Sequence, residues 1–296
     1  MKSLAFIHRN DAYFAVESFY PVVSVFSHYD LGNTISPFLL LDHIGPGRLK
    51  PDQVRQGVQQ HPHRGFETVT LVFQGEIEHW DSQGHGGVIG PGDVQWMTAA
   101  SGILHKEQFS EAFTRQGGPF EVLQLWVNLP ARDKMQAPRY QSLSNAAIPC
   151  FDFPDRAGRA RVIAGEFLGI TGPALTHSPI TLVDLHLAAG QTLQLPAQHL
   201  DTTLLYMRRG KAQFSAAASA DEILTDQGLA VMSSHGEHLQ IQTLSDCEVL
   251  LMSGTPLNEP LFGRGFYVMN TQEEVREAIE DMKKGTFLKL APEDHN

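Results

Sequence analysis

Short apolar runs, in which apolar and polar residues alternate in part, fill most of the chain, and this pattern is typical of β-strands. Examples are residues 67–73, 122–129 and 181–187, each rich in β-branched and aromatic side chains. Turns containing glycine and proline separate such runs, as at residues 45–47 and 90–92. Many short strands at this spacing predict an all-β protein built from sandwiches or barrels.

One segment near the end of the chain has helical periodicity instead. Thr271 and Glu274 form a capping-box pattern, and Gly285 suits the position just after a helix. The apolar positions between them fall on one helical face: Val275, Ala278, Ile279 and Met282. We therefore predict a C-terminal helix and expect it to pack over the second half of the chain.

The strand pattern occurs twice. Residues 68–79 align without gaps to residues 203–214, and the alignment matches Gly75 to Gly210. Two copies of one β unit would account for both the repeat and the length of 296 residues.

A proline-rich stretch at residues 130–154 lies between the two copies and reads as a linker. We expect a first domain over 1–134 and a second domain over 135–296, which ends in the predicted helix. A chain of this length is sufficient for two domains that each bury a core.

Composition narrows the classes of function. The formal net charge is −11, which argues against direct binding of nucleic acid, because phosphate recognition requires clustered Lys and Arg. The two cysteines, Cys150 and Cys247, are far apart and predict no disulfide framework. Neither a secretory signal nor a run of about 20 apolar residues is apparent. We expect a cytoplasmic protein with no membrane segment.

Two short strings carry the candidate chemistry. His61 and His63 are two residues apart, and so are His105 and Glu107. On a strand this spacing points both side chains to the same face, so two neighbouring strands would present four convergent ligands. Three imidazoles and one carboxylate suit a divalent transition metal, and iron, zinc, manganese, nickel and copper all fit. Closed structural zinc sites favour thiolates, so we expect a metal with open positions for catalysis.

The second copy lacks these side chains. The positions that match His61 and His63 are Pro196 and Gln198, so we expect the second domain to keep the fold without the metal. The other histidines are expected to play ordinary surface or hydrogen-bonding roles, for example His79, His177 and His186. A metal-free relict of the site is expected around three more: His199, His235 and His238.

The full set of motifs resembles the pirin family. The matching strings are FLLLDH at 38–43, HPHRGFETVT at 61–70, PGDVQWMTAASGILHKE at 91–107, LQLWVNLP at 123–130, and SGTPLNEP with GFYVMNT between 253 and 271. The resemblance implies two stacked cupin β-barrels with a metal only in the N-terminal one. It implies His61, His63, His105 and Glu107 as ligands and iron as the metal, while zinc, nickel or manganese fit the same ligands.

The resemblance also implies an activity like that of quercetin 2,3-dioxygenases. In that reaction O2 cleaves a flavonol such as quercetin and carbon monoxide is released, so the expected partners are a small planar phenol and O2. Glu107 would act as the general base. Asp42 is expected to orient a ligand histidine, and Glu67 to form hydrogen bonds instead of binding the metal. The expected lining of the substrate pocket is Phe38, Leu40, Phe66 and Trp126.

Two other functions remain open. The family also contains regulators, so the chain is alternatively an iron-dependent redox regulator or transcription cofactor that acts through a protein partner. An open apolar mouth beside the metal would favour the enzyme, and a plugged site would favour the regulator. The third reading is a non-redox cupin isomerase that uses its metal as a Lewis acid and tolerates zinc.

Overall fold

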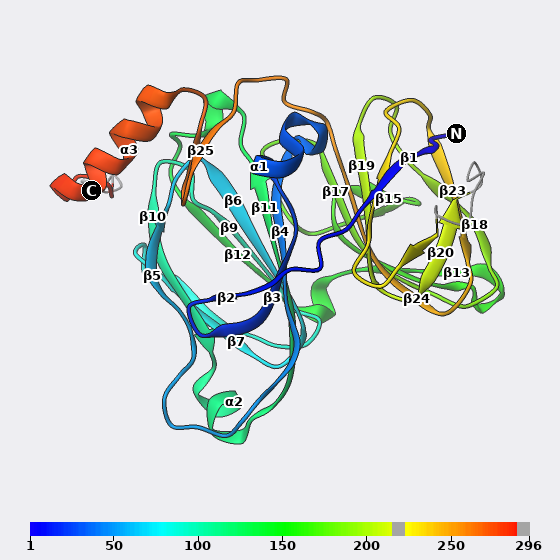
Figure 1. Ribbon diagram of the computed structural model, residues 1–296, viewed down its shortest axis with the longest axis horizontal. Helices are drawn as coiled ribbons and strands as arrows, with labels where there is room; N and C mark the ends of the chain where they lie inside the picture. The colour runs from blue at the N-terminus through cyan, green and yellow to red at the C-terminus, as the bar shows by residue number, and fades with distance from the viewer. Residues whose placement is uncertain (215–222, 289–296) are drawn as a thin grey trace. The chain divides into compact units, whose positions relative to one another are not determined.

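The computed structural model describes residues 1–214 and 223–288, and strands dominate both ranges (Figure 1). The chain divides into two compact units, each assembled from separate segments. The first unit comprises Ala12–Ser24, Phe38–Asn145 and Asn258–Asn296. The second unit comprises Met1–Asp11, Val25–Pro37 and Ala146–Leu257.

The first unit is built from two antiparallel sheets. The 7-stranded sheet has the order β12-β9-β6-β11-β4-β3-β2, and the 4-stranded sheet has the order β5-β10-β7-β8. The larger sheet consists of β2 (Tyr13–Val16), β3 (Phe19–Ser27), β4 (Phe38–Leu49), β6 (Phe66–Gln74), β9 (Val94–Thr98), β11 (Gly118–Asn128) and β12 (Arg139–Leu143). The smaller sheet consists of β5 (Gly57–His63), β7 (Ile77–Asp81), β8 (Gly86–Ile89) and β10 (Ile103–Phe109).

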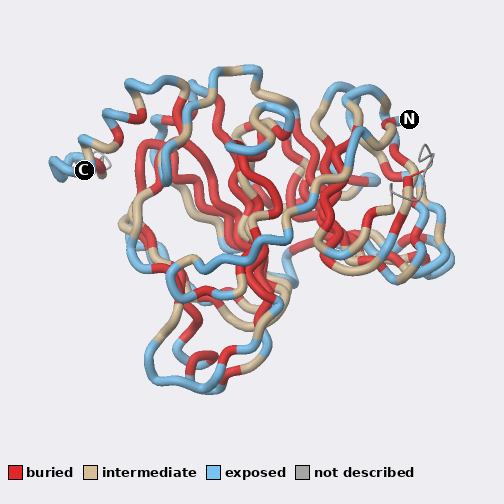
Figure 2. The backbone as a smooth tube through the Cα atoms, viewed as in Figure 1, coloured by how far each residue is buried: buried red, intermediate tan, exposed pale blue. Residues whose placement is uncertain are grey.

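A core fills the space between these two sheets. Val72 and Val122 from the larger sheet pack in one buried cluster with Ile77, Ile89 and Phe109 from the smaller one. The alternation of side chains along each strand directs every second residue into this core. In Figure 2 the buried positions accordingly follow the strands, while many of the turns are exposed.

The second unit repeats this plan. Its 7-stranded sheet has the order β1-β22-β19-β24-β17-β14-β13, and its 4-stranded sheet has the order β18-β23-β20-β21. The larger sheet consists of β1 (Leu4–His8), β13 (Cys150–Phe153), β14 (Gly158–Ala164), β17 (Ile180–Leu187), β19 (Thr202–Arg209), β22 (Leu229–Met232) and β24 (Cys247–Gly254). The smaller sheet consists of β18 (Thr192–Pro196), β20 (Lys211–Phe214), β21 (Leu224–Thr225) and β23 (His238–Thr243).

The predicted internal repeat is confirmed by the topology. β6 lies between β9 and β11, and β19 lies between the corresponding strands β22 and β24. Gly75 and Gly210 both follow these central strands at positive φ, 83° and 108°, which explains glycine at both turns.

Shorter elements connect the sheets. The helices are α1 (His28–Leu31), α2 (Glu111–Gln116) and α3 (Gln272–Lys284), with 3-10 turns at η1 (Gly32–Ile35), η2 (Ala131–Asp133), η3 (Asn145–Ala147) and η4 (Pro154–Arg156). Two small strand pairs are β15 (Glu166–Phe167) with β16 (Ile170–Thr171), and β25 (Phe262–Arg264) with β26 (Tyr267–Met269). Within residues 1–214 and 223–288, no helix is long and apolar enough to cross a membrane. Both cysteines are free.

The predicted C-terminal helix is present as α3. The Thr271 hydroxyl accepts from the Glu274 N–H at 3.1 Å, and the Glu274 carboxylate accepts from the Thr271 N–H at 2.8 Å. Gly285 ends the helix at φ 72°. The helix buries Val275 and Ala278 and packs beside β25 and β26 (Figure 1).

The compact units differ from a division of the chain at residue 134. β1 pairs with β22 and so belongs to the second unit, where it supplies an edge strand. Residues 258–288, including α3, belong to the first unit and not to the second half as expected. Long-range hydrogen bonds connect this segment to the first unit: Arg64 Nη1 donates to Asp281 Oδ2 on α3 at 2.8 Å, and Lys134 Nζ donates to the Val268 carbonyl oxygen at 2.9 Å.

Gly65 provides a test of how closely residues 258–288 pack against the first unit. Its φ is 91°, and a Cβ built there would lie 2.0 Å from the Val268 carbonyl oxygen. We expect Gly65→Ala to lower the free energy of unfolding by about 3 kcal/mol, because backbone strain and a clash act together. Urea unfolding of the whole chain measures this loss.

Gly84→Ala is the matched control. Gly84 has a similar φ of 84° but no atom within 4 Å of its Cβ position. Its substitution should cost only about 1 kcal/mol, from backbone strain alone. Equal losses in the two variants would contradict the close packing of β26 on Gly65.

Candidate metal centre

Two neighbouring strands bring the predicted ligands together. His61 and His63 end β5, and His105 and Glu107 lie on β10, which pairs with β5 so that His61 is opposite His105. The rings of His61 and His105 are 4.3 Å apart between centroids, and those of His63 and His105 are 4.7 Å apart. The three imidazoles therefore lie close together on these two strands.

The hydrogen bonds of His61 leave a nitrogen lone pair facing this cluster. His61 Nδ1 is 2.7 Å from the Gln59 carbonyl oxygen, which only accepts, so Nδ1 carries the hydrogen and Nε2 keeps its lone pair. His61 Nε2 lies 3.1 Å from His63 Nε2. Two nitrogens bound at adjacent positions of an octahedral ion, with bonds of about 2.1 Å, have nearly this separation.

His105 also has, near His61 and His63, a ring nitrogen without a hydrogen-bond partner among the described residues. Its Nε2 is buried and, in the part of the chain that the structure describes, has no hydrogen-bond partner. A buried nitrogen without a partner is costly, and an ion would satisfy it. One nitrogen from each of His61, His63 and His105 lies within 4.8 Å of the others, so these residues fit a metal ion.

Burial keeps two of the three imidazoles neutral. It lowers the pKa of His63 and of His105 well below the ordinary value of 6.5, and the neighbouring histidines lower both further. Neutral imidazole is the form that binds a metal.

Glu107 is held by two hydrogen bonds. The Thr70 hydroxyl donates to Oε1 at 3.0 Å, and Gln124 Nε2 donates to Oε2 at 2.5 Å. Its carboxylate groups with His105 and His79, so the described residues contain two overlapping ligand sets that share His105. Ligation of a single ion by all four predicted residues stays a prediction.

Sequence reasoning missed the place of His79. This residue lies on β7 directly opposite Glu107, is only 1% exposed, and its Nδ1 is 3.4 Å from His105 Nδ1. The spacing of His79 and Asp81 repeats that of the two ligand pairs, and this signal was available in the sequence. The order of the strands, which sets β7 beside β10, was not.

Aromatic rings surround His63. Its ring centroid is 5.0 Å from Phe66, 5.3 Å from Trp126 and 5.5 Å from Phe266. Phe266 also lies 5.0 Å from the His61 ring, and it comes from the turn between β25 and β26. The sequence did not indicate Phe266, because it is some 200 residues from both histidines in the chain.

The other predicted lining residues are placed less directly. Leu40 packs against the cluster that contains Phe66 and Trp126. Phe38 is buried opposite Val127 at the start of β4 and is not a member of that cluster.

Two buried carboxyls lie on β4 and β6, the two strands that flank β11 in the larger sheet. Asp42, expected to orient a histidine, is placed opposite Gln124, the donor to Glu107. Glu67 accepts from the Thr98 hydroxyl at 2.6 Å. Burial raises the pKa of each carboxyl to about 7.

The second unit shows what corresponds to the histidine pair. Pro196 on β18 pairs with His238 on β23, as His61 on β5 pairs with His105 on β10. His199 and His235 have ring centroids 5.4 Å apart. A proline thus stands opposite His238 where an imidazole stands opposite His105.

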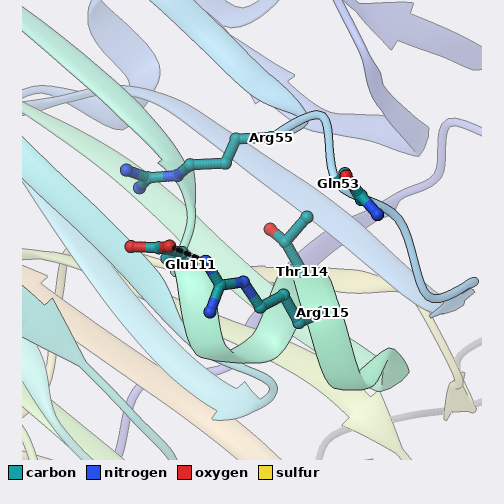
Figure 3. A pocket seen from close by; sticks show the side chains of 5 residues that line it. All are labelled: Gln53, Arg55, Glu111, Thr114 and Arg115. Atoms are coloured by element: carbon teal, nitrogen blue, oxygen red, sulfur yellow. Dashed lines mark hydrogen bonds and ion pairs between the residues drawn. The ribbon is translucent and has the colours of Figure 1, made fainter.

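A cavity of about 370 Å³ lies elsewhere in the first unit, beside α2 (Figure 3). It is lined by Gln53, Arg55, Glu111, Thr114 and Arg115. Arg115 pairs with Glu111, and Arg55 pairs with Glu78 at 2.8 Å. Because its cations are already paired with carboxylates, this cavity is a weaker candidate site than the histidine cluster.

Comparisons with known proteins agree with the architecture. The family Pirin matches residues 20–127, and the Pirin C-terminal cupin domain matches residues 182–288. A Pseudomonas aeruginosa protein, named provisionally as a quercetin 2,3-dioxygenase, is 50% identical over 98% of this chain and 99% of its own. A pirin-like protein of Solanum lycopersicum is 36% identical over 85% of this chain and 81% of its own.

A solved structure is similar over nearly the whole chain. The crystal structure of quercetin 2,3-dioxygenase from Acinetobacter baumannii has a TM-score of 0.93 and 41% identity, covering 98% of this chain and 100% of that one. The predicted fold class, two cupin domains with a C-terminal helix, is confirmed.

The raised pKa of Glu67 predicts how stability depends on pH. Between pH 4.5 and about 7 the unfolded chain ionises this carboxyl while the folded chain keeps it protonated, so stability falls as pH rises through this window. Glu67→Gln should remove this loss, which is at most about 3 kcal/mol.

Melting temperatures of both proteins from pH 4 to pH 8 test this. We expect the melting temperature of the variant to rise relative to that of the wild type as pH rises, and the two melting temperatures to differ little at pH 4. Parallel curves would show that Glu67 is already ionised in the folded chain.

Proposed function

The chain belongs to the pirin family, and we propose that its first unit is a metal-dependent dioxygenase that cleaves flavonols such as quercetin with O2. The observation that supports this most strongly is the convergence of His61, His63 and His105 beside the carboxylate of Glu107. The names of two similar proteins, from P. aeruginosa and A. baumannii, point to the same activity.

We propose His61, His63, His105 and Glu107 as the residues that hold the metal. The absence of thiolates from this set suits iron, and zinc, nickel or manganese fit the same ligands. When bound, iron supplies positive charge that favours loss of the enol proton, and a redox-active centre for reaction with O2. Iron(II) and the two free cysteines both suit a reducing compartment, so we propose a cytoplasmic location.

Glu107 is suited to take the enol proton of a flavonol. Thr70 and Gln124 each donate to one of its oxygens, which orients the carboxylate and leaves further lone pairs free. A carboxylate that is both held in place and beside the substrate is the arrangement required of a general base.

Phe66, Trp126 and Phe266 provide flat apolar faces next to the histidines. A planar phenol stacks well on such faces, which also keep water from the reacting carbons. Phe266 is 40% exposed, so part of its ring is open to solvent beside the histidines.

One observation favours the redox regulator as a second candidate. His63 and His105 are only 1% and 0% exposed, and Phe266 stands over two of the rings. A covered metal suits a sensor whose oxidation state is read by a protein partner. The dioxygenase requires a substrate to pass Phe266 and reach the metal, whereas the redox regulator does not.

Oxygen uptake separates these candidates. Protein loaded anaerobically with iron(II) should consume O2 when quercetin is added, with loss of the flavonol absorbance and release of carbon monoxide. His61→Ala should lower the rate by at least about 100-fold, because it removes a ligand. His238→Ala, at the position in the second unit that matches His105, should leave the rate unchanged.

Absence of uptake by protein that demonstrably holds iron would exclude quercetin as the substrate. Equal loss in the two variants would place the chemistry outside the histidine cluster. In the first case the redox regulator becomes the leading function.

Phe266→Ala tests the approach to the site. Loss of one stacking face should raise KM for quercetin by about 10-fold, which corresponds to about 1.4 kcal/mol, without changing the iron content. Phe262→Ala is the matched control, since Phe262 is 37% exposed at the open end of the same strand pair. An unchanged KM for the Phe266 variant would show that substrate does not bind against this ring.

A further inference from the structure

A chain of polar side chains leads away from the metal cluster on the side opposite His61. It runs from His105 on β10 to His79 and Asp81 on the neighbouring strand β7. All three residues are buried, with exposures of 0%, 1% and 0%. Buried polar groups of this kind are costly unless they serve each other or a ligand.

The contacts among His105, His79 and Asp81 show which nitrogen of each histidine carries the hydrogen. Asp81 Oδ2 lies 3.5 Å from His79 Nε2, which is within ion-pair distance, although His79 Nε2 makes no hydrogen bond among the described residues. Asp81 Oδ1 accepts the backbone N–H groups of Gln83 and His85 at 2.8 and 3.1 Å. A carboxylate only accepts, so it favours the tautomer of His79 with hydrogen on Nε2. The Nδ1 atom of a neutral His79 is then an acceptor.

This acceptor sets the tautomer of His105. His79 Nδ1 is 3.4 Å from His105 Nδ1, so His105 must supply the hydrogen of that contact. The hydrogen of His105 is thereby held on Nδ1, and the lone pair stays on Nε2. That Nε2 is one of the buried side-chain atoms that have no hydrogen-bond partner in the described part of the protein.

We propose that His79, oriented by Asp81, is a positioning residue that holds the His105 imidazole in the one tautomer and orientation able to bind the metal. The inference rests on the proposed metal site. The Tyr140 ring stacks on the His79 ring, with 5.1 Å between ring centroids and 13° between ring planes. This stacking fixes the plane of the His79 imidazole. Groups that orient metal-binding histidines in this way affect metal affinity strongly.

Cobalt(II) binding by the full chain tests the proposal without reference to catalysis. His79→Leu removes the acceptor and should weaken cobalt affinity by about 10- to 100-fold in calorimetric titrations. His79→Asn places an amide oxygen near the position of Nδ1 and should restore most of the affinity. X-ray absorption should find the same number of bound imidazoles in the wild type and in His79→Asn.

His85→Leu is the matched control. His85 Nδ1 lies 3.2 Å from the same Asp81 oxygen, Oδ2. The His85 ring also stacks on Tyr140, with 5.7 Å between ring centroids and 9° between ring planes. It is not the residue that contacts His105, so its loss should leave cobalt affinity unchanged. Melting temperatures of the metal-free proteins identify any variant that fails to fold.

Three outcomes would overturn the proposal. Wild-type affinity in His79→Leu would show that His105 needs no such support. A bound imidazole missing from His79→Asn would make His79 a ligand and not a positioning residue. If the wild type itself binds no cobalt, iron or nickel, the proposed function fails together with this inference, whereas the first two outcomes leave that function intact.

Discussion

A single buried ammonium group holds together the parts of the first unit that form the site. Lys134 Nζ donates to the carbonyl oxygens of Gly65 and Val268, at 2.6 and 2.9 Å, and to Asn128 Oδ1 at 2.5 Å. Gly65 lies two residues after His63, and Val268 lies two residues after Phe266. Three acceptors offset the burial, which lowers the pKa of Lys134 to about 7. Lys134 therefore links the segment that follows the histidines to the segment that carries Phe266.

Arg64 makes a second connection to the C-terminal segment. Its guanidinium donates to the Ser101 and Phe287 carbonyl oxygens at 2.7 and 3.0 Å, as well as to Asp281. Arg64 is 2% exposed, and a buried guanidinium requires such a set of acceptors. Because Arg64 follows His63 directly, the charge that anchors the C-terminal segment and the imidazoles of the cluster lie on adjacent residues. The position of the His63 imidazole is thus coupled to the packing of residues 258–288.

This coupling explains what the sequence could predict and what it could not. Ligand pairs two residues apart, strands with period 2 and a capping box are local signals, so His61, His63, His105 and α3 could all be predicted. His79 depends on which strands are neighbours, and Phe266 depends on hydrogen bonds made by Arg64 and Lys134 some 130 to 220 residues away. The spacing of His79 and Asp81 is a local signal, but no local pattern shows that their strand lies beside β10 or that Phe266 lies beside the histidines. The prediction that α3 packs over the second half of the chain was wrong for the same reason.

The second unit shows that the fold does not require the histidines. It has the same two sheets with Pro196 opposite His238. In the first unit, His63 and His105 carry lowered pKa values, so below pH 6.5 the unfolded chain takes up protons that the folded chain refuses. Stability therefore falls as pH decreases through this range, and the buried imidazoles cost the metal-free fold free energy. An ion bound by neutral imidazoles favours the folded chain and offsets that cost, so these histidines make physical sense as ligands and not as part of the core.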